Sequence, residues 1–83
     1  MPNPHPLKNG SFYIFTPSLT ADAKPQGMGD VLPNQEFSRG WFLDFQDGHY
    51  IFLGKPHDSE HSYFFCLPAA EVGRAVLDPN QVV

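Results

Sequence analysis

An Asp-Gly pair at 47–48 separates two short apolar runs, and this feature constrains the fold more than any other in the chain. A two-residue connection between strands favours a type I′ turn, in which both central residues need a positive φ, and Asp-Gly readily supplies it. The runs GWFLDFQ and HYIFLG therefore predict a hairpin with strands near 41–46 and 49–54. This turn places Gln46 opposite His49 and so sets the register of both strands.

Two further strands and one helix complete the predicted fold. Residues 11–16, SFYIFT, and 62–67, SYFFCL, are rich in aromatic residues and are bounded by turn residues, which is typical of strands. Pro68 suits the first position of a helix and Asp78-Pro79 would end it, so we expect a helix near 68–78. The predicted fold class is α+β, a small four-stranded antiparallel sheet with one C-terminal helix; the alternative is a small SH3-like β-barrel.

The length of 83 residues predicts one small domain. We expect the domain to span 11–78, with a flexible N-terminal arm at 1–10 and a C-terminal tail at 79–83. Residues 17–36 contain three prolines and two glycines without helical or strand periodicity, which predicts a long loop. Loops of this length are usually functional or disordered. We expect this one either to contact a partner or to fold over the sheet edge and cap the core.

Alternation along the strands sorts the predicted side chains onto two faces, provided that Gly54 faces Ser62 in the last strand pair. The first face is nearly all apolar and is the predicted core beneath the helix: Trp41, Leu43, Phe45, Tyr50, Phe52, Phe64 and Cys66. The second face mixes polar and apolar residues: Phe42, Asp44, Gln46, His49, Ile51, Leu53, Tyr63, Phe65 and Leu67. A helix of about ten residues is only ~15 Å long and cannot cover both faces. The 17–36 loop, curling of the sheet into a barrel, or another protein chain would have to cover the second face.

The apolar surface of the second face predicts an interaction site, because large exposed apolar patches usually mark such sites. We expect this face and the long loop to bind a partner protein or a second copy of the chain, as a homodimer. The predicted partner-binding residues are Phe42, Leu53, Tyr63, Phe65, Leu19, Met28 and Leu32.

The segment HDSEH at 57–61 holds two histidines with carboxylates between them, a pattern that raises the possibility of a zinc site. Zinc needs three or four ligands around one point. On the predicted pairing Cys66 lies about 13 Å along its strand from Ser62, and His49 sits at the opposite end of the hairpin. We therefore interpret His57 and His61 as part of a solvated turn and expect no metal. A site made by these two alone would be open and weak, or completed by another chain.

Asp44 and His49 lie diagonally on the predicted second face, where a carboxylate could orient an imidazole as a general base. No nucleophile accompanies them, because Ser62 is predicted to point to the other face. Cys66 is expected to be a small buried hydrophobic residue. We therefore expect no enzymatic activity, no catalytic residues and no cofactor.

Charge and composition restrict the partners further. Nine acidic against five basic residues give a net charge of −4, which disfavours nucleic acid. Aromatic rings near Arg39, Lys55 and His49 could stack single-stranded bases, but the basic residues form no run or stripe. No apolar run approaches the ~20 residues that span a bilayer. The single cysteine suggests a reducing compartment, so we expect a cytoplasmic protein.

Two hypotheses for the function follow from these patterns. The first is a non-catalytic protein-interaction module, such as a small inhibitor, an accessory protein or a regulatory subunit; a phage or mobile element is a source that suits a short acidic chain of this kind. The alternative is a small-molecule or metal-binding domain with its site near Asp44 and His49 or near His57 and His61.

Overall fold

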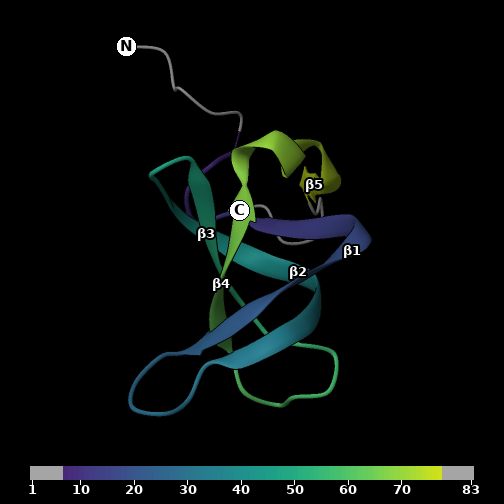
Figure 1. Ribbon diagram of the computed structural model, residues 1–83. Coiled ribbons are helices and arrows are strands. Elements are labelled where there is room, and N and C mark those ends of the chain that lie inside the picture. Colours follow the sequence, from purple (N-terminus) through teal and green to yellow (C-terminus); the bar gives the residue numbers. More distant parts are fainter. Residues whose placement is uncertain (1–6, 78–83) are drawn as a thin grey trace.

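The computed structural model of the protein describes residues 7–77, which form an antiparallel sheet with one short 3-10 helix (Figure 1). The elements in chain order are β1 (Phe12–Pro25), β2 (Leu32–Gln46), β3 (His49–Gly54), β4 (Tyr63–Pro68), the 3-10 helix η1 (Ala69–Arg74) and β5 (Ala75–Leu77). The predicted small antiparallel sheet in a single domain is confirmed.

Strand β1 pairs with three neighbours, and this closes the sheet's pairings into a circuit. The strand order is β2-β3-β4-β1-β5, with an additional pairing of β2 with β1. The first half of β1 lies between β2 and β5, where Ile14 faces both Arg39 and Val76. The end of β1 pairs with β4, where Lys24 faces Phe64. Figure 1 shows β1 and β2 as long neighbouring ribbons; their length lets β1 reach partners at both of its ends.

The core consists mainly of aromatic rings. Its buried residues are Leu7, Tyr13, Phe15, Leu19, Ala23, Phe37, Phe42, Tyr50, Phe52, Phe65 and Leu67. The ring of Phe65 stacks on Phe37 with a centroid distance of 3.8 Å and on Phe52 at 5.5 Å. Phe15 meets the edges of the same cluster, 5.0 Å from Phe52 and 5.7 Å from Phe65. Ring pairs of this kind stabilise a core beyond the apolar area that they bury.

The predicted hairpin between β2 and β3 is confirmed. Asp47 and Gly48 have φ angles of 51° and 76°, so both have the positive values that a type I′ turn requires. Gln46 faces His49, as the turn predicted. The local sequence is sufficient here because the turn residues alone determine the geometry of so short a connection.

The observed register differs from the predicted one by one residue in two places, once between β2 and β3 and once between β3 and β4. The side chains in the core are therefore not the ones predicted. The register of β2 shifts just after Phe42, which therefore faces Phe52. In the next strand pair Gly54 faces Tyr63 instead of Ser62. Because side chains alternate with a period of two, each slip moves a whole segment to the opposite face.

The predicted assignment of the two faces is accordingly wrong in both β2 and β4. Phe42, Phe65 and Leu67, predicted on the second face, are buried in the core, while Trp41 and Leu43, predicted in the core, are each 38% exposed. Phe64 and Cys66, also predicted in the core, face Leu53 and Ile51 and are only half-buried, so the expected burial of Cys66 is wrong as well.

The predicted helix at 68–78 is also wrong. Its first part is the short 3-10 helix η1, and its second part is strand β5. Gly73 weakens a helix at the middle of this segment, and Val76 is β-branched and suits a strand. As a strand, this segment pairs with β1, where Ile14 faces Val76. The backbone groups of β1 thereby gain hydrogen-bond partners that a helix, whose own groups are paired internally, could not supply.

The predicted loop at 17–36 is strand over most of its length. Strand β1 continues to Pro25 and β2 begins at Leu32, so only residues 26–31 connect the two strands. Leu19 faces Phe37 within the paired region. Pro17 lies where the register between β1 and β2 shifts, a position at which a strand tolerates proline. The prolines are therefore the reason that these strand residues were predicted as a loop.

The N-terminal arm predicted at 1–10 falls only partly on described residues. Leu7 is buried, and the N–H of Gly10 donates to the carbonyl of Phe42 at 2.8 Å. Residues 7–10 therefore pack on the sheet and are not part of a free arm. Residues 1–6 and the tail predicted at 79–83 lie outside the part of the chain that the structure describes.

Candidate functional site

A pocket of about 510 Å³ opens between β1, β2, the end of β3 and the segment that follows β3. It is lined by Phe12, Ser38, Arg39, Trp41, Leu53, Gly54, Lys55, Pro56, His57, Ser59 and Ser62. Strand alternation places its aromatic residues outside the core, because Phe12 precedes the buried Tyr13 and Trp41 precedes the buried Phe42. We call this site the aromatic–basic pocket.

One wall of the pocket is a row of apolar side chains across three strands. Phe12 of β1 faces Trp41 of β2, which in turn faces Leu53 of β3. The rings of Phe12 and Trp41 meet edge to face, with centroids 4.8 Å apart and an interplanar angle of 65°. Trp41 is 38% exposed and is the single tryptophan of the chain. A large part of an aromatic ring thus remains available to a ligand.

The polar lining of the pocket is basic or neutral, although the chain as a whole is acidic. Arg39 and Lys55 are two of the five Lys and Arg residues, both are exposed, and neither makes an ion pair within residues 7–77. Among the described residues, 7–77, no aspartate or glutamate lines the pocket. Because the net charge is −4, this local excess of positive charge comes from the placement of these two residues.

The segment after β3 is held against β2 by a double contact. His57 Nδ1 lies 2.6 Å from Glu36 Oε2, and the backbone N–H of His57 donates to the carbonyl of Glu36 at 2.9 Å. Within the segment the N–H of Ser59 donates to the carbonyl of Pro56 at 3.1 Å. These contacts keep the far side of the pocket in place.

Two glycines allow β3 to approach β2 closely beneath the pocket. A Cβ atom on Gly54 would lie 2.5 Å from the carbonyl oxygen of Arg39, and one on Gly40 would lie 2.8 Å from the ring of Phe65. At Gly54 only glycine fits, because the carbonyl of Arg39 is a backbone group that cannot move aside, and at Gly40 the fully buried ring of Phe65 would have to shift. Lys55 follows Gly54 directly and is thereby brought beside the strand that carries Arg39.

Most of the predicted partner-binding residues do not lie in this pocket. Phe42, Phe65 and Leu19 are buried in the core, so the prediction that they lie on an exposed face is wrong. Leu53 lines the pocket. Tyr63 and Leu32 are half-buried, and Met28 is fully exposed in the connection between β1 and β2. The structure therefore does not gather these residues into one surface.

Asp44 and His49 do not form the diagonal pair that was considered. Asp44 Oδ1 accepts the N–H of Phe45 at 2.8 Å, and its Oδ2 accepts Gln46 Nε2 at 2.9 Å. His49 Nδ1 instead lies 3.0 Å from the carbonyl oxygen of Asp47. Both side chains serve the ends of the hairpin turn, and within residues 7–77 no contact joins one to the other.

The two histidines of the 57–61 segment contact different residues. His57 contacts Glu36, while the backbone N–H of His61 donates to Ser59 Oγ at 3.1 Å. Among residues 7–77, no group of three or more His, Cys, Asp and Glu side chains is placed to hold a metal ion.

The pocket residues Trp41 and Phe12 are the ones that sequence reasoning missed. The alternation rule assigned Trp41 to the core because it contains no signal for the register shift after Phe42. The sequence contains one signal: Arg39 and Lys55 flank aromatic residues, the pattern of a possible stacking platform. The structure brings both of these cations to one pocket.

Comparison with known proteins identifies no relative. No family model matches the chain, and neither the curated proteins nor the solved structures contain a significant match. Within residues 7–77, no helix has the length and apolar character needed to span a bilayer.

Proposed function

We propose that this protein is a non-catalytic protein-interaction module, an inhibitor, accessory protein or regulatory subunit, that binds a partner through the aromatic–basic pocket. The observation that supports this most is the exposed Trp41 ring beside Arg39, which makes no ion pair within residues 7–77, in an open pocket. Tryptophan and arginine are strongly enriched among the residues that carry most of the binding energy of protein interfaces. The function is the one predicted from the sequence, but the binding surface is the aromatic–basic pocket instead of the predicted second face.

The apolar surface continues beyond the pocket, which favours a protein ligand. Ile14, 37% exposed, faces Val76 of β5, which is 52% exposed. Ile14 also lies two residues from Phe12 on the same strand and faces Arg39 of the neighbouring strand β2. We call Phe12, Ile14, Trp41 and Val76 the outer patch. A partner that fills the pocket and extends over this patch would bury all four side chains.

We further propose that the closed circuit of strand pairings is a small SH3-like β-barrel, the alternative considered from the sequence. The support is the double pairing of β1 with β2 and β4, together with the 3-10 helix before a short last strand. In such a fold few strand edges remain free. Recognition would then depend on side chains of the outer face rather than on added strands.

Selection from a phage-displayed library of random linear peptides tests the function. We expect the wild-type chain to enrich peptides that no longer bind after Trp41→Ala. Leu43→Ala is the matched control, because Leu43 is equally exposed at 38% but does not line the pocket. Urea unfolding of both variants verifies that the fold persists. Enriched peptides that bind Trp41→Ala as well as wild type would refute the pocket as the binding surface.

A second copy of the chain is one partner that this proposal allows. Light scattering over a range of concentrations should then show a dimer that dissociates in the Trp41→Ala variant and persists in Leu43→Ala. A monomer at all concentrations would leave a different protein as the partner.

A small-molecule ligand is the second candidate function, and the size of the pocket favours it. A volume of about 510 Å³ lies within the roughly 300–1,000 Å³ that is usual for ligand sites. In a thermal-shift screen, a metabolite that binds the pocket should then raise the unfolding temperature, because a ligand that binds only the native state stabilises that state. The rise should be absent in Trp41→Ala, and a screen without response would argue against this candidate.

A further inference from the structure

We infer that the aromatic–basic pocket recognises an acidic linear segment of a partner protein, in which one or more carboxylates flank an apolar or aromatic side chain. This inference rests on the proposed function and names the chemistry of its ligand.

Charge complementarity is the first argument. The pocket is lined by Arg39 and Lys55 and by no carboxylate, in a chain that carries nine acidic residues. Glu36 contacts the pocket residue His57 at 2.6 Å, and Asp58 and Glu60 follow in the same segment without being part of the lining. An acidic segment would therefore meet two cations that no carboxylate of residues 7–77 pairs. A basic segment would meet like charges, whose approach is unfavourable.

The spacing of the cations and the aromatic ring is the second argument. Arg39 and Trp41 are two residues apart on β2, so their side chains leave the same face of the strand. Lys55 reaches the same pocket from the end of β3, where Gly54 allows close approach to the Arg39 backbone. A guanidinium can hold a carboxylate through two parallel N–H donors, and an ammonium adds a point charge. The anionic group and the apolar anchor of one segment would thus bind side by side.

The extent of the surface favours a segment of a protein over a free small acid. Ile14 and Val76 lie outside the pocket lining yet adjoin it through the pairing of β1. Only a ligand longer than the pocket would bury them. Single-stranded nucleic acid is disfavoured because its affinity depends on many cations along the backbone, and this site offers two.

Titration of Trp41 fluorescence with three blocked peptide pools tests the inference. The probes are peptides of equal length with one central Phe or Leu, flanked by Asp and Glu, by Asn and Gln, or by Lys and Arg. We expect only the acidic pool to change the fluorescence, and its affinity to weaken with added salt, because surface charges are screened over ~10 Å at 0.1 M. Since Trp41 is the single tryptophan, the signal reports on the pocket itself.

Two double variants with equal net charge give the control. Arg39→Gln with Lys55→Gln should weaken binding of the acidic pool at least about tenfold, as expected for loss of two charge-assisted contacts. Lys8→Gln with Lys24→Gln removes the same charge from exposed residues outside the pocket and should change it little. Equal weakening in both variants would show an effect of net charge alone and would overturn the inference.

The remaining outcomes separate this inference from the proposed function. If the displayed library yields peptides that depend on Trp41 but are neutral or basic, the function stands and the acidic ligand is wrong. If no Trp41-dependent peptide is found and light scattering shows no Trp41-dependent dimer, the function itself fails. Binding of a thymidine oligonucleotide in place of the acidic pool, or of phenylacetate as tightly as the acidic pool, would also overturn the inference, assigning the pocket to nucleic acid or to a free small acid.

Discussion

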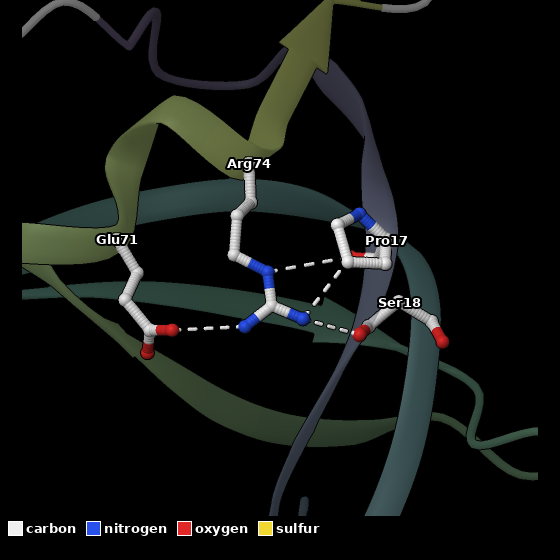
Figure 2. Close-up of polar contacts among 4 residues, drawn as sticks. All are labelled: Pro17, Ser18, Glu71 and Arg74. Carbon is white, nitrogen blue, oxygen red and sulfur yellow. Dashed lines mark hydrogen bonds and ion pairs between the residues drawn. The ribbon is translucent and has the colours of Figure 1, made fainter.

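The guanidinium of Arg74, at the end of η1, donates a hydrogen bond to the backbone carbonyl of Ser18 in β1, 56 residues earlier in the chain (Figure 2). Its Nε and Nη2 also donate to the carbonyl of Pro17 at 3.4 and 3.2 Å. Its Nη1 donates to Glu71 Oε1 at 2.8 Å. One side chain therefore joins the 3-10 helix to the part of β1 where the register on β2 shifts.

Arg74→Ala should lower the free energy of unfolding by about 1.5 kcal/mol or more, because hydrogen bonds from a charged donor to backbone carbonyls are lost. Arg74→Lys should recover little of it, since one ammonium cannot reach carbonyls and carboxylate together. Glu71→Gln is the control: it removes only a half-exposed ion pair and should cost ~0–1 kcal/mol. Urea denaturation measures all three variants. Arg74→Ala as stable as Glu71→Gln would contradict this role.

Gly54→Ala should destabilise the chain by about 1–3 kcal/mol, as overpacking in a close-packed site does. Its Cβ would lie 2.5 Å from the Arg39 carbonyl and 3.1 Å from Gly40 Cα, both backbone atoms. Gly27→Ala is the matched control, because a Cβ there meets nothing within 4 Å. The control should be neutral or slightly stabilising through the unfolded chain. Equal midpoints in urea for the two variants would show that β2 and β3 can separate at this point.

Phe65→Ala should cost about 3–5 kcal/mol, the range for deleting a buried ring. Phe65 is fully buried and stacks on both Phe37 and Phe52. For a small domain this loss approaches the whole free energy of unfolding, so we expect loss of the cooperative thermal transition. Met28→Ala, at an exposed position, should leave the transition unchanged. A folded Phe65→Ala chain with a nearly normal transition would place Phe65 outside the core.

We expect the free energy of unfolding to fall at high pH because of the Tyr50 hydroxyl. Burial raises the pKa of Tyr50 above its ordinary value of 10.0, because desolvation disfavours the phenolate. The folded state therefore keeps its proton at a pH where the unfolded chain releases it. The corresponding stability is present below pH ~10 and is lost as the pH rises through the folded pKa.

Tyr50→Phe provides the measurement for this pH dependence. The phenyl ring cannot ionise, so the free energy of unfolding of the variant should fall less steeply above pH ~10 than that of wild type. Urea midpoints at a series of alkaline pH values give both slopes. Parallel slopes would show that Tyr50 does not contribute to the alkaline loss of stability.

Local signals in the sequence predicted the parts of the fold that local chemistry determines. The Asp47-Gly48 turn, the strand at 49–54 and the facing of Gln46 and His49 agree with the structure. The strand predicted at 62–67 is displaced by one residue, to Tyr63–Pro68. For these elements, propensity and turn geometry act over a few neighbouring residues and are visible in the chain itself.

The candidate site depends on contacts between distant residues and was therefore beyond local signals. The register shift after Phe42 brings a buried ring to Phe52 and leaves Trp41 outside, but alternation alone contains no sign of an inserted residue. The gathering of Arg39 and Lys55 likewise requires β2 and β3 to meet at Gly54. Their separation in sequence gave no measure of their distance in space.

The sequence by itself determined the turn at Asp47-Gly48 and that the aromatic residues form an antiparallel sheet, because turn chemistry and strand propensity are local. Tertiary structure alone decided which rings are buried and what the segment after Pro68 becomes. The same residues could form a helix or pair with β1, and the strand is favoured because it pairs the backbone of β1 on the side opposite β2. Packing of Phe42 against Phe52 then leaves Trp41 exposed in the pocket, because a one-residue change of register exchanges the core face for the outer face.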